Sequence, residues 1–176
     1  MFKIAPTLDS ENLLLRPLIE QDFDDLFSCA GNKRVWAGHP STERYKKENF
    51  KQWFSDALAS KNSLAIIEKS TNKIIGSTRF YFDGIPENAV AIGYTFLSYQ
   101  YWGGNVNKEL KAMMLSYAFE FYESVWFHIS PINIRSQKAI LKIGASYVKE
   151  KTVSLGGSEP SLWRFYKIVN PLTQNK

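Results

Sequence analysis

A loop with two adjacent glycines, SYQYWGGNVNKELK at 98–111, stands between a predicted strand and a predicted amphipathic helix. The first turn of a helix leaves about four backbone N–H groups without intrahelical partners and carries partial positive charge, so a phosphate there gains hydrogen bonds and dipole energy together. Gly103 and Gly104 would let the backbone approach such a ligand closely. The loop therefore suits an anion.

Side chains of the same loop add to this preference. Asn105 and Asn107 tolerate left-handed backbone angles, and Lys108 and Lys111 place positive charge at the start of the helix. We therefore predict a pyrophosphate site, while a plain Gly-Gly turn is the alternative for the loop taken alone. Two other nucleotide sites are unlikely on spacing, because the chain has neither G-x-x-x-x-G-K-S/T nor G-x-G-x-x-G after its first strand.

Titratable residues outside the loop offer a second set of candidates. His39, in the segment WAGHP, would suit a base because an unperturbed histidine titrates near neutral pH. Strand alternation places Arg79 and Tyr81 on one face, where they could bind an acidic group. Each has a structural alternative, which is a satisfied loop histidine for His39 and an ion pair closing the sheet for Arg79. His128 alternates with core residues, so we predict a structural role for it.

The amino-acid composition limits the class of protein to which these residues can belong. The chain has 176 residues, of which 44% are hydrophobic, with 22 lysines and arginines against 17 acidic residues and a formal net charge of +5. This apolar content predicts one globular domain over 1–176 and excludes disorder. Cys29 is the single cysteine beside two histidines, which excludes a disulfide scaffold and leads us to expect no metal site. No segment resembles a signal peptide or a membrane span, so we expect a cytoplasmic protein that does not bind membranes.

Hydrophobic periodicity and turn residues predict the strands and helices that surround these candidate residues. Strands joined by short turns are expected at 64–68, 74–82 and 89–97, which makes an antiparallel meander. A helix over 106–122 then leads to a strand at 125–129, and such a unit favours a parallel pair. The other expected elements are a strand at 13–18, helices at 23–30, 43–60 and 133–143, and strands at 145–150 and 162–169. We predict an α+β (mixed α/β) fold with a mostly antiparallel seven-stranded sheet and helices packed on it.

Four segments in this order resemble the GNAT superfamily of acetyl-CoA-dependent N-acetyltransferases, and within it the branch of bacterial ribosomal-protein N-terminal acetyltransferases. They are LLLRPLIEQDFDDLF (13–27), IIGSTRF (74–80), AIGYTFL with YWGGNVNKEL (91–110) and NIRSQKAILKIGA (133–145). The resemblance implies a GNAT-like fold with helices on both faces of the sheet. It also implies that acetyl-CoA lies between two splayed parallel strands, here 89–97 and 125–129.

The resemblance assigns residues to acetyl-CoA position by position. Backbone groups near Phe96 and Leu97 would hold the pantetheine, and amide groups of the loop would bind the pyrophosphate. Asn133 matches the family asparagine that contacts the cofactor, and Ser136 lies one helical turn further on. The implied cofactor-binding set is Phe96, Leu97, Trp102, Gly103, Gly104, Asn105, Val106, Asn107, Lys108, Asn133 and Ser136.

The chain departs from the family pattern in the loop and at two positions that many relatives use for acid and base chemistry. Both customary small residues of the loop are asparagines here, Asn105 and Asn107, which we expect to preserve its shape and to add ligands or caps. Ala91 stands where many relatives have a glutamate base, and Ile140 stands where many have a tyrosine acid. The usual acid and base residues are therefore missing.

Other residues become the candidates for proton transfer and acceptor binding. We name Ser136 as candidate acid or proton relay, and a serine bonded to its own helix is the alternative. His39 is the candidate base. His39, Arg79 and Tyr81 are the candidate contacts to the acceptor, whose identity the sequence leaves open.

These assignments predict transfer of an acetyl group from acetyl-CoA to a primary amine, either a protein N-terminus or a small molecule, by direct attack in a ternary complex. The missing acid and base residues motivate an alternative, a non-catalytic CoA-binding or sensory domain. Nucleic-acid binding is disfavoured, because the aromatic residues mostly fall on periodic core faces. Formation of a homodimer is left open.

Overall fold

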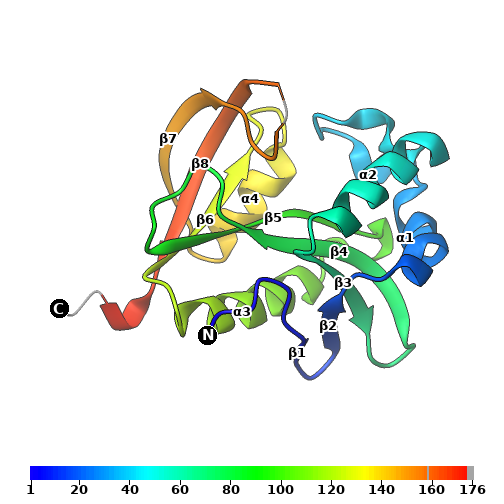
Figure 1. Ribbon diagram of the computed structural model, residues 1–176, viewed down its shortest axis with the longest axis horizontal. Helices are drawn as coiled ribbons and strands as arrows, with labels where there is room; N and C mark the ends of the chain where they lie inside the picture. Colours follow the sequence, from blue (N-terminus) through cyan, green and yellow to red (C-terminus); the bar gives the residue numbers. More distant parts are fainter. Residues whose placement is uncertain (158, 174–176) are drawn as a thin grey trace.

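The computed structural model describes residues 1–157 and 159–173, which form one mixed sheet with helices on both faces (Figure 1). Within these residues the sheet has eight strands in the order β1-β2-β3-β4-β5-β6-β8-β7. The strands are β1 (Leu8–Asp9), β2 (Leu13–Pro17), β3 (Ser63–Glu68), β4 (Lys73–Tyr81), β5 (Ala89–Leu97), β6 (Ser124–Ile129), β7 (Ser146–Val153) and β8 (Ser161–Val169). The α-helices are α1 (Phe23–Ala30), α2 (Lys47–Ala59), α3 (Val106–Phe119) and α4 (Ile134–Lys142).

The strand pairings confirm the expected fold class. Antiparallel ladders join β3, β4 and β5 in sequence order, as short turns require. The connection through α3 makes β5 and β6 parallel, and β8 pairs antiparallel with both β6 and β7. Gly144 ends α4 with a φ of 94°, the left-handed conformation expected of a glycine cap.

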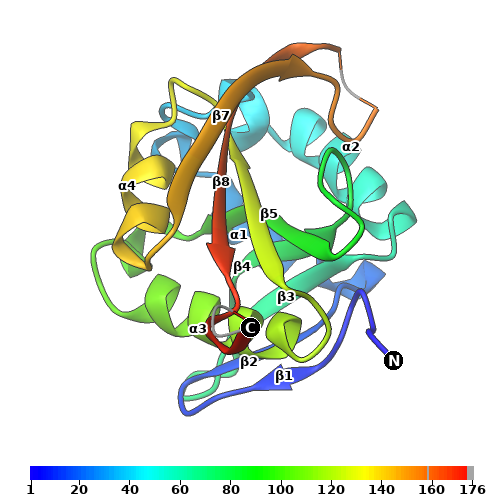
Figure 2. The ribbon, with the colours of Figure 1, turned by 90° about the vertical axis from the view of Figure 1, so that its left-hand side faces the viewer.

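The two faces of the sheet carry different helices (Figures 1 and 2). Leucine, isoleucine and valine side chains of the strands pack against α3 and α4, where Leu110, Met114 and Ile140 are buried. The opposite face packs against α1 and α2 through a cluster of aromatic rings. These rings are Trp36, Phe50, Trp53, Phe54 and Phe96.

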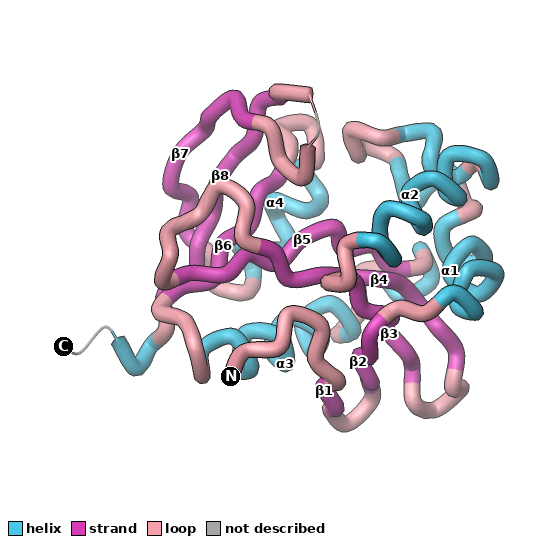
Figure 3. Tube along the Cα trace, in the orientation of Figure 1, coloured by secondary structure: helices cyan, strands magenta, loops and turns pink. Residues whose placement is uncertain are grey.

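The chain between α1 and α2 contributes to that second face. It runs as loop with two short 3₁₀ helices, Lys33–Trp36 and Thr42–Tyr45 (Figure 3). Trp36 anchors the first turn, because its indole Nε1 donates to the Ala30 carbonyl at 2.8 Å in a buried environment. This segment therefore lies against the sheet through an aromatic side chain.

The structure differs from the prediction in the number of strands and in several element boundaries, among them the end of β7 at Val153 in place of 150. The sheet has eight strands in place of seven because Leu8–Asp9 pairs with β2, a two-residue strand too short to leave a periodic pattern. The helix predicted over 43–60 is shorter, since Lys46 adopts an extended conformation that separates the 3₁₀ turn from α2. The helix predicted to 122 ends at Phe119.

Candidate active site

The parallel pair of β5 and β6 opens after three residues. Its ladder consists of Ala89–Ser124, Val90–Val125 and Ala91–Trp126, whereas β6 pairs with β8 along its whole length. Beyond Ala91 the two strands therefore diverge, and their carboxyl ends lead toward the starts of α3 and α4. The splayed parallel pair implied by the resemblance is confirmed.

A β-bulge lies where β5 leaves β6. Ser77 pairs with Phe96 and Arg79 pairs with Gly93, so that Tyr94 and Thr95 together oppose one residue of β4. Tyr94 has a φ of 53°, which is uncommon for a residue with a side chain. A two-against-one bulge bends its strand and raises the local twist, which favours the divergence from β6.

The loop before α3 leaves the helix start open. Gly103 has a φ of 78°, and a Cβ built on Gly103 or Gly104 would meet no atom within 4 Å. Asn105 is the residue that precedes the helix, but its side chain makes no capping hydrogen bond. The first-turn N–H groups therefore have no side-chain cap, and the space around the glycines suits an anion.

Two expectations for this loop are wrong. Neither asparagine caps the helix as expected, since the Asn105 side chain makes no capping hydrogen bond and Asn107 lies inside the helix, and the positive φ of this loop belongs to Gly103. Lys111 is buried rather than presented to the loop, and its Nζ donates to Thr95 Oγ1 at 2.8 Å. Burial lowers the pKa of the Lys111 ammonium to about 7. Lys108 is the exposed lysine at this helix start.

Trp102 ties the end of β5 to α4. Its Nε1 donates to the Leu97 carbonyl at 3.1 Å, and the Arg135 guanidinium lies 3.7 Å from its ring centroid. Arg135 also donates to the Val35 carbonyl at 3.1 Å. The Phe96 carbonyl faces β4. A pantetheine chain in the opening would therefore meet a Leu97 carbonyl that already accepts a hydrogen bond from the indole.

The start of α4 brings the next two predicted residues together. Asn133 caps the helix, since its Oδ1 accepts from the Ser136 backbone N–H at 3.2 Å. The Ser136 side chain is half-buried, and its hydroxyl donates to no described residue. The alternative in which this hydroxyl bonds its own helix is therefore not seen, and the hydroxyl is free to contact a ligand.

His39 lies in the loop after Trp36 and contacts that ring edge-on, with centroids 5.3 Å apart. The Ser41 backbone N–H donates to His39 Nδ1 at 2.9 Å. Burial, followed by the charges of Arg44 and Arg135, lowers the pKa of His39 to about 3. The neutral ring carries its proton on Nε2, because Nδ1 is an acceptor. His39 therefore offers a donor, and this geometry argues against its expected role as a base.

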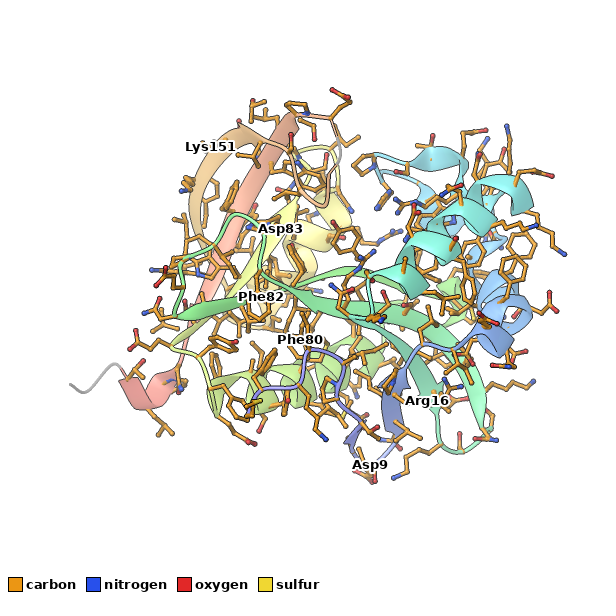
Figure 4. All side chains as sticks on the ribbon, in the orientation of Figure 1. Asp9, Arg16, Phe80, Phe82, Asp83 and Lys151 are labelled. Carbon is orange, nitrogen blue, oxygen red and sulfur yellow. The ribbon has the colours of Figure 1, made fainter. Side chains whose placement is uncertain are left out.

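Arg79 and Tyr81 lie on the face opposite α3, as alternation predicts. Phe80, between them, points toward α3 and packs on Tyr117, with centroids 5.9 Å apart (Figure 4). The Arg79 guanidinium lies 3.6 Å from the Tyr94 ring centroid, and the ion pair considered for it is not found among the described residues.

Tyr81 is directed to a buried histidine. Its hydroxyl lies 3.0 Å from His128 Nδ1, and burial raises the pKa of Tyr81 and lowers that of His128 to about 4. The His128 Nε2 atom is buried without a partner among the described residues. The Tyr81 hydroxyl is therefore already engaged, while Arg79 remains available to a ligand.

Sequence reasoning missed three residues around the opening: Arg44, Tyr94 and Arg135. Arg44 lies in the 3₁₀ turn before α2, with its guanidinium 5.5 Å from the Trp36 centroid. The sequence offered one indication for Tyr94, its place beside the glycine of the GYTF segment. The bulge that turns Tyr94 toward Arg79 cannot be predicted from the residue pattern of the strand. Ala91 and Ile140 are both buried, and Ile140 belongs to the α3-side core.

The described residues contain neither a metal-binding cluster nor a helix that could span a membrane. No cluster of histidine, cysteine, aspartate and glutamate in that part of the chain could hold a metal ion. No helix there has both the length and the apolar character needed to cross a bilayer.

Comparison with known proteins extends these observations. The family model of the acetyltransferase (GNAT) domain matches residues 12–146. The uncharacterized N-acetyltransferase YoaA of Bacillus subtilis (strain 168) is 24% identical over 152 residues, which cover 79% of this chain and 82% of that protein.

Two solved structures share the fold. A GCN5-related N-acetyltransferase from Brucella melitensis has a TM-score of 0.79 at 16% identity, over 96% of this chain and 83% of that one. A structure from Vibrio cholerae, described as a candidate ribosomal-protein-serine acetyltransferase, has a TM-score of 0.73 at 15% identity, over 93% and 97%. Since the family model spans more than half of the sequence, and the strands diverge beside the open helix start, this chain belongs to the GNAT acetyltransferase family.

Proposed function

We propose that this protein transfers the acetyl group of acetyl-CoA to a primary amine, by direct attack of the amine in a ternary complex. One observation carries the proposal: β5 and β6 part after Ala91 next to the uncapped start of α3. The opening supplies unpaired strand backbone, and the helix start supplies unpaired N–H groups. Together they suit a long ligand with a phosphate at one end.

The loop residues fit the phosphate end of acetyl-CoA. Gly103 and Gly104 leave space for close approach, and Lys108 adds an exposed positive charge. Trp102, stacked on Arg135, and the Asn133 cap border the same opening. Acetyl-CoA supplies the acetyl thioester, and these residues would orient it.

Proton transfer in this site rests on few groups. The amine must be neutral to attack, and the departing thiolate must gain a proton. We propose that the free Ser136 hydroxyl acts as acid or relay at the start of α4. Ala91 and Ile140 cannot exchange protons, so the proton lost by the amine would pass to water.

Two measurements test the function. Calorimetry should show that acetyl-CoA binds, and absence of CoA binding would rule out both the enzyme and the CoA-binding alternative. Release of free thiol from acetyl-CoA should then depend on an added amine, in a panel of peptides, polyamines, amino acids and aminoglycosides. Release without an amine would mean hydrolysis instead.

Ser136→Ala tests the proposed relay. Removing the hydroxyl should lower kcat by about 100-fold or more, because positioned general acids contribute roughly 10²- to 10⁴-fold. The affinity for CoA should stay nearly unchanged. Ser116→Ala, at an exposed serine of α3, is the matched control. Unchanged turnover in the Ser136 variant would remove this residue from the mechanism.

The buried Ala91 and Ile140 favour a second candidate function, a non-catalytic CoA-binding or sensory domain. It predicts CoA binding without thiol release for any amine of the panel. A protein N-terminus and a small molecule both remain candidate acceptors at this level. Homodimer formation and a cytoplasmic location stay predictions.

A further inference from the structure

Arg44 and Arg79 are half-buried arginines whose guanidinium groups form no ion pair with a described carboxylate. The salt bridges within the described residues use other cations. Arg16, by contrast, forms a bidentate ion pair, because its two Nη atoms each lie 2.7 Å from an oxygen of Asp22. Two arginines on one face are thus left without the carboxylate that Arg16 has.

The charge on these arginines persists. Burial lowers the pKa of both, and the nearby charge of Arg79 also lowers that of Arg44, to about 10. Both stay protonated at neutral pH, since a guanidinium does not lose its proton in proteins. Asp56 lies near enough to raise the pKa of both arginines, and Asp83 does so for Arg79, but no carboxylate of the described residues forms an ion pair with either guanidinium. Two like charges in a partly dry environment therefore lack a directly paired counter-charge.

Aromatic rings contact both guanidinium groups. Tyr94 lies under Arg79 at 3.6 Å and Trp36 lies near Arg44 at 5.5 Å, measured to the ring centroids. A cation–π contact uses none of the five N–H donors of a guanidinium, which stay free for a ligand. These donors are the part that binds a carboxylate with two parallel hydrogen bonds. No described residue accepts a hydrogen bond from either arginine side chain.

The position of Arg79 ties it to the opening between β5 and β6. Arg79 pairs with Gly93, two residues beyond Ala91, which is roughly 7 Å along a strand. It lies on the face opposite α3, whereas the phosphate end of acetyl-CoA is assigned to the start of α3. The anion for Arg79 is therefore distinct from the cofactor phosphates.

Arg44 also borders a cavity of about 400 Å³, beside Asn49, Gln52, Trp53 and Asp56. The lining also includes two acids, of which Glu43 pairs with Lys46 and Asp56 has one carboxylate oxygen 2.9 Å from Gln52 Nε2. Amides, an aromatic ring and an arginine give this cavity the mixed polar character that suits a small polar molecule.

We propose that Arg44 and Arg79 bind a carboxylate of the acetyl acceptor, so that the acceptor is a small amine with a carboxylate a few bonds from its amino group, as in amino acids. The inference rests on the function proposed above. The amine nitrogen forms a bond to the acetyl carbon and the C–S bond breaks. The nitrogen loses a proton, and CoA leaves as the free thiol after gaining one.

The test compares amino acids with their amides. L-Alanine and L-glutamate are assayed by thiol release from acetyl-CoA, with L-alaninamide as the matching amide of L-alanine and spermidine as an amine without a carboxylate. We expect kcat/KM to be at least about 10-fold higher for the amino acid than for the matching α-amide. Arg79→Gln and Arg44→Gln should each raise KM for amino acids by about 10-fold or more with a smaller change in kcat, since uniform binding is lost.

Controls separate binding from folding. Arg34→Gln removes an exposed arginine that stacks on Tyr99 at 5.8 Å, and it should leave KM unchanged. Arg79→Lys keeps the positive charge but loses the planar, bidentate N–H donors of the guanidinium, so it should recover part of the affinity that Arg79→Gln loses. CoA binding of every variant should match the wild type, and no variant should unfold at a lower temperature, since removing a charge without an ion pair does not destabilise the fold.

Each outcome is decisive. Equal rates for amino acids and amides, or unchanged KM in both glutamine variants, would overturn the carboxylate site while acetyl transfer stands. If no amine is acetylated, the proposed function fails, and calorimetric titration of L-alanine and L-glutamate into the CoA-bound protein decides the site alone. Binding that Arg79→Gln abolishes supports it, and no binding overturns it.

Discussion

Lys111 and Arg79 are cations that form no ion pair with any described residue, and they contact neighbouring residues of one bulge from opposite faces of the sheet. Lys111 reaches Thr95 from α3, whereas Arg79 lies on the ring of Tyr94. The lysine can shed its proton, since burial lowers its pKa to about 7, and the neutral amine still donates to Thr95. The arginine keeps its charge. The cation on the α3 face can therefore become neutral without a ligand, whereas the charge of Arg79 on the opposite face can be paired only by a ligand, in line with the proposed carboxylate site.

The largest pH-dependent effect should come from Lys111→Met, which removes the titrating amine. The folded-state pKa of about 7 lies below the ordinary value of 10.5, so between them the unfolded chain binds a proton that the native chain lacks. Stability of the wild type should therefore rise with pH from about 7, by up to roughly 1.4 kcal/mol per pH unit. Between pH 7 and pH 9 this amounts to about 2–3 kcal/mol.

Urea unfolding at the two pH values measures that rise. In Lys111→Met it should disappear, and the variant should be more stable than the wild type at pH 7, since no charge is left to desolvate. Lys108→Met, at the exposed lysine of the same helix, should keep the wild-type slope. Equal slopes in all three proteins would show that Lys111 does not titrate in this range.

The next effect concerns the loop that covers Tyr94 on the opposite face. Gly156 has a φ of 60°, and a Cβ added there would lie 2.6 Å from the Tyr94 hydroxyl oxygen. Its backbone N–H donates to Asp83 Oδ2 at 3.0 Å, which ties the loop to the end of β4 (Figure 4). An added methyl group must therefore displace Tyr94 or the loop.

Gly156→Ala and Gly157→Ala form a matched pair. Gly157 has a φ of 74° but open space around it, so both alanines incur the left-handed penalty of about 1–2 kcal/mol. Only the first meets Tyr94, and overpacking should add about 1–3 kcal/mol to its loss of stability. It should also raise KM for the amine while leaving KM for acetyl-CoA unchanged. Equal unfolding free energies for the pair would mean that the contact with Tyr94 carries no energy.

The two faces also differ in how far the sequence predicted them. The α3 face follows from helical periodicity and from strand alternation, so Leu110, Met114 and Phe80 could be placed before the structure was known. Lys111 could not, because a lysine one turn into a helix has no pattern that shows it beneath a bulge. Periodicity gives the buried stripe but not which polar residue extends under it.

The acceptor face depends on irregular structure. Arg44 lies in a 3₁₀ turn that was predicted as part of a longer helix, and Tyr94 is turned toward Arg79 by the bulge. His39 could be named from its type, yet its free atom is a donor because Ser41 occupies Nδ1. Side chains brought together by turns and bulges from distant segments leave no spacing to read. The splay of β5 and β6, by contrast, followed from a resemblance in continuous segments.

The smallest effect tests the charge that remains at the start of α3. Lys108 is exposed there, where a positive side chain opposes the helix dipole. Lys108→Glu should therefore stabilise the free protein by about 0.3–1 kcal/mol and at the same time weaken acetyl-CoA binding by roughly 5-fold. Opposite signs in one variant distinguish a ligand-binding lysine from a structural one.

Lys51→Glu, on the exposed side of α2, makes the same change in net charge and should alter neither quantity by a comparable amount. Calorimetry at low and high salt gives the second check, because screening should reduce the difference between Lys108→Glu and the wild type. If both variants weaken binding equally, the effect belongs to net charge, and the first turn of α3 binds its anion through backbone N–H groups alone.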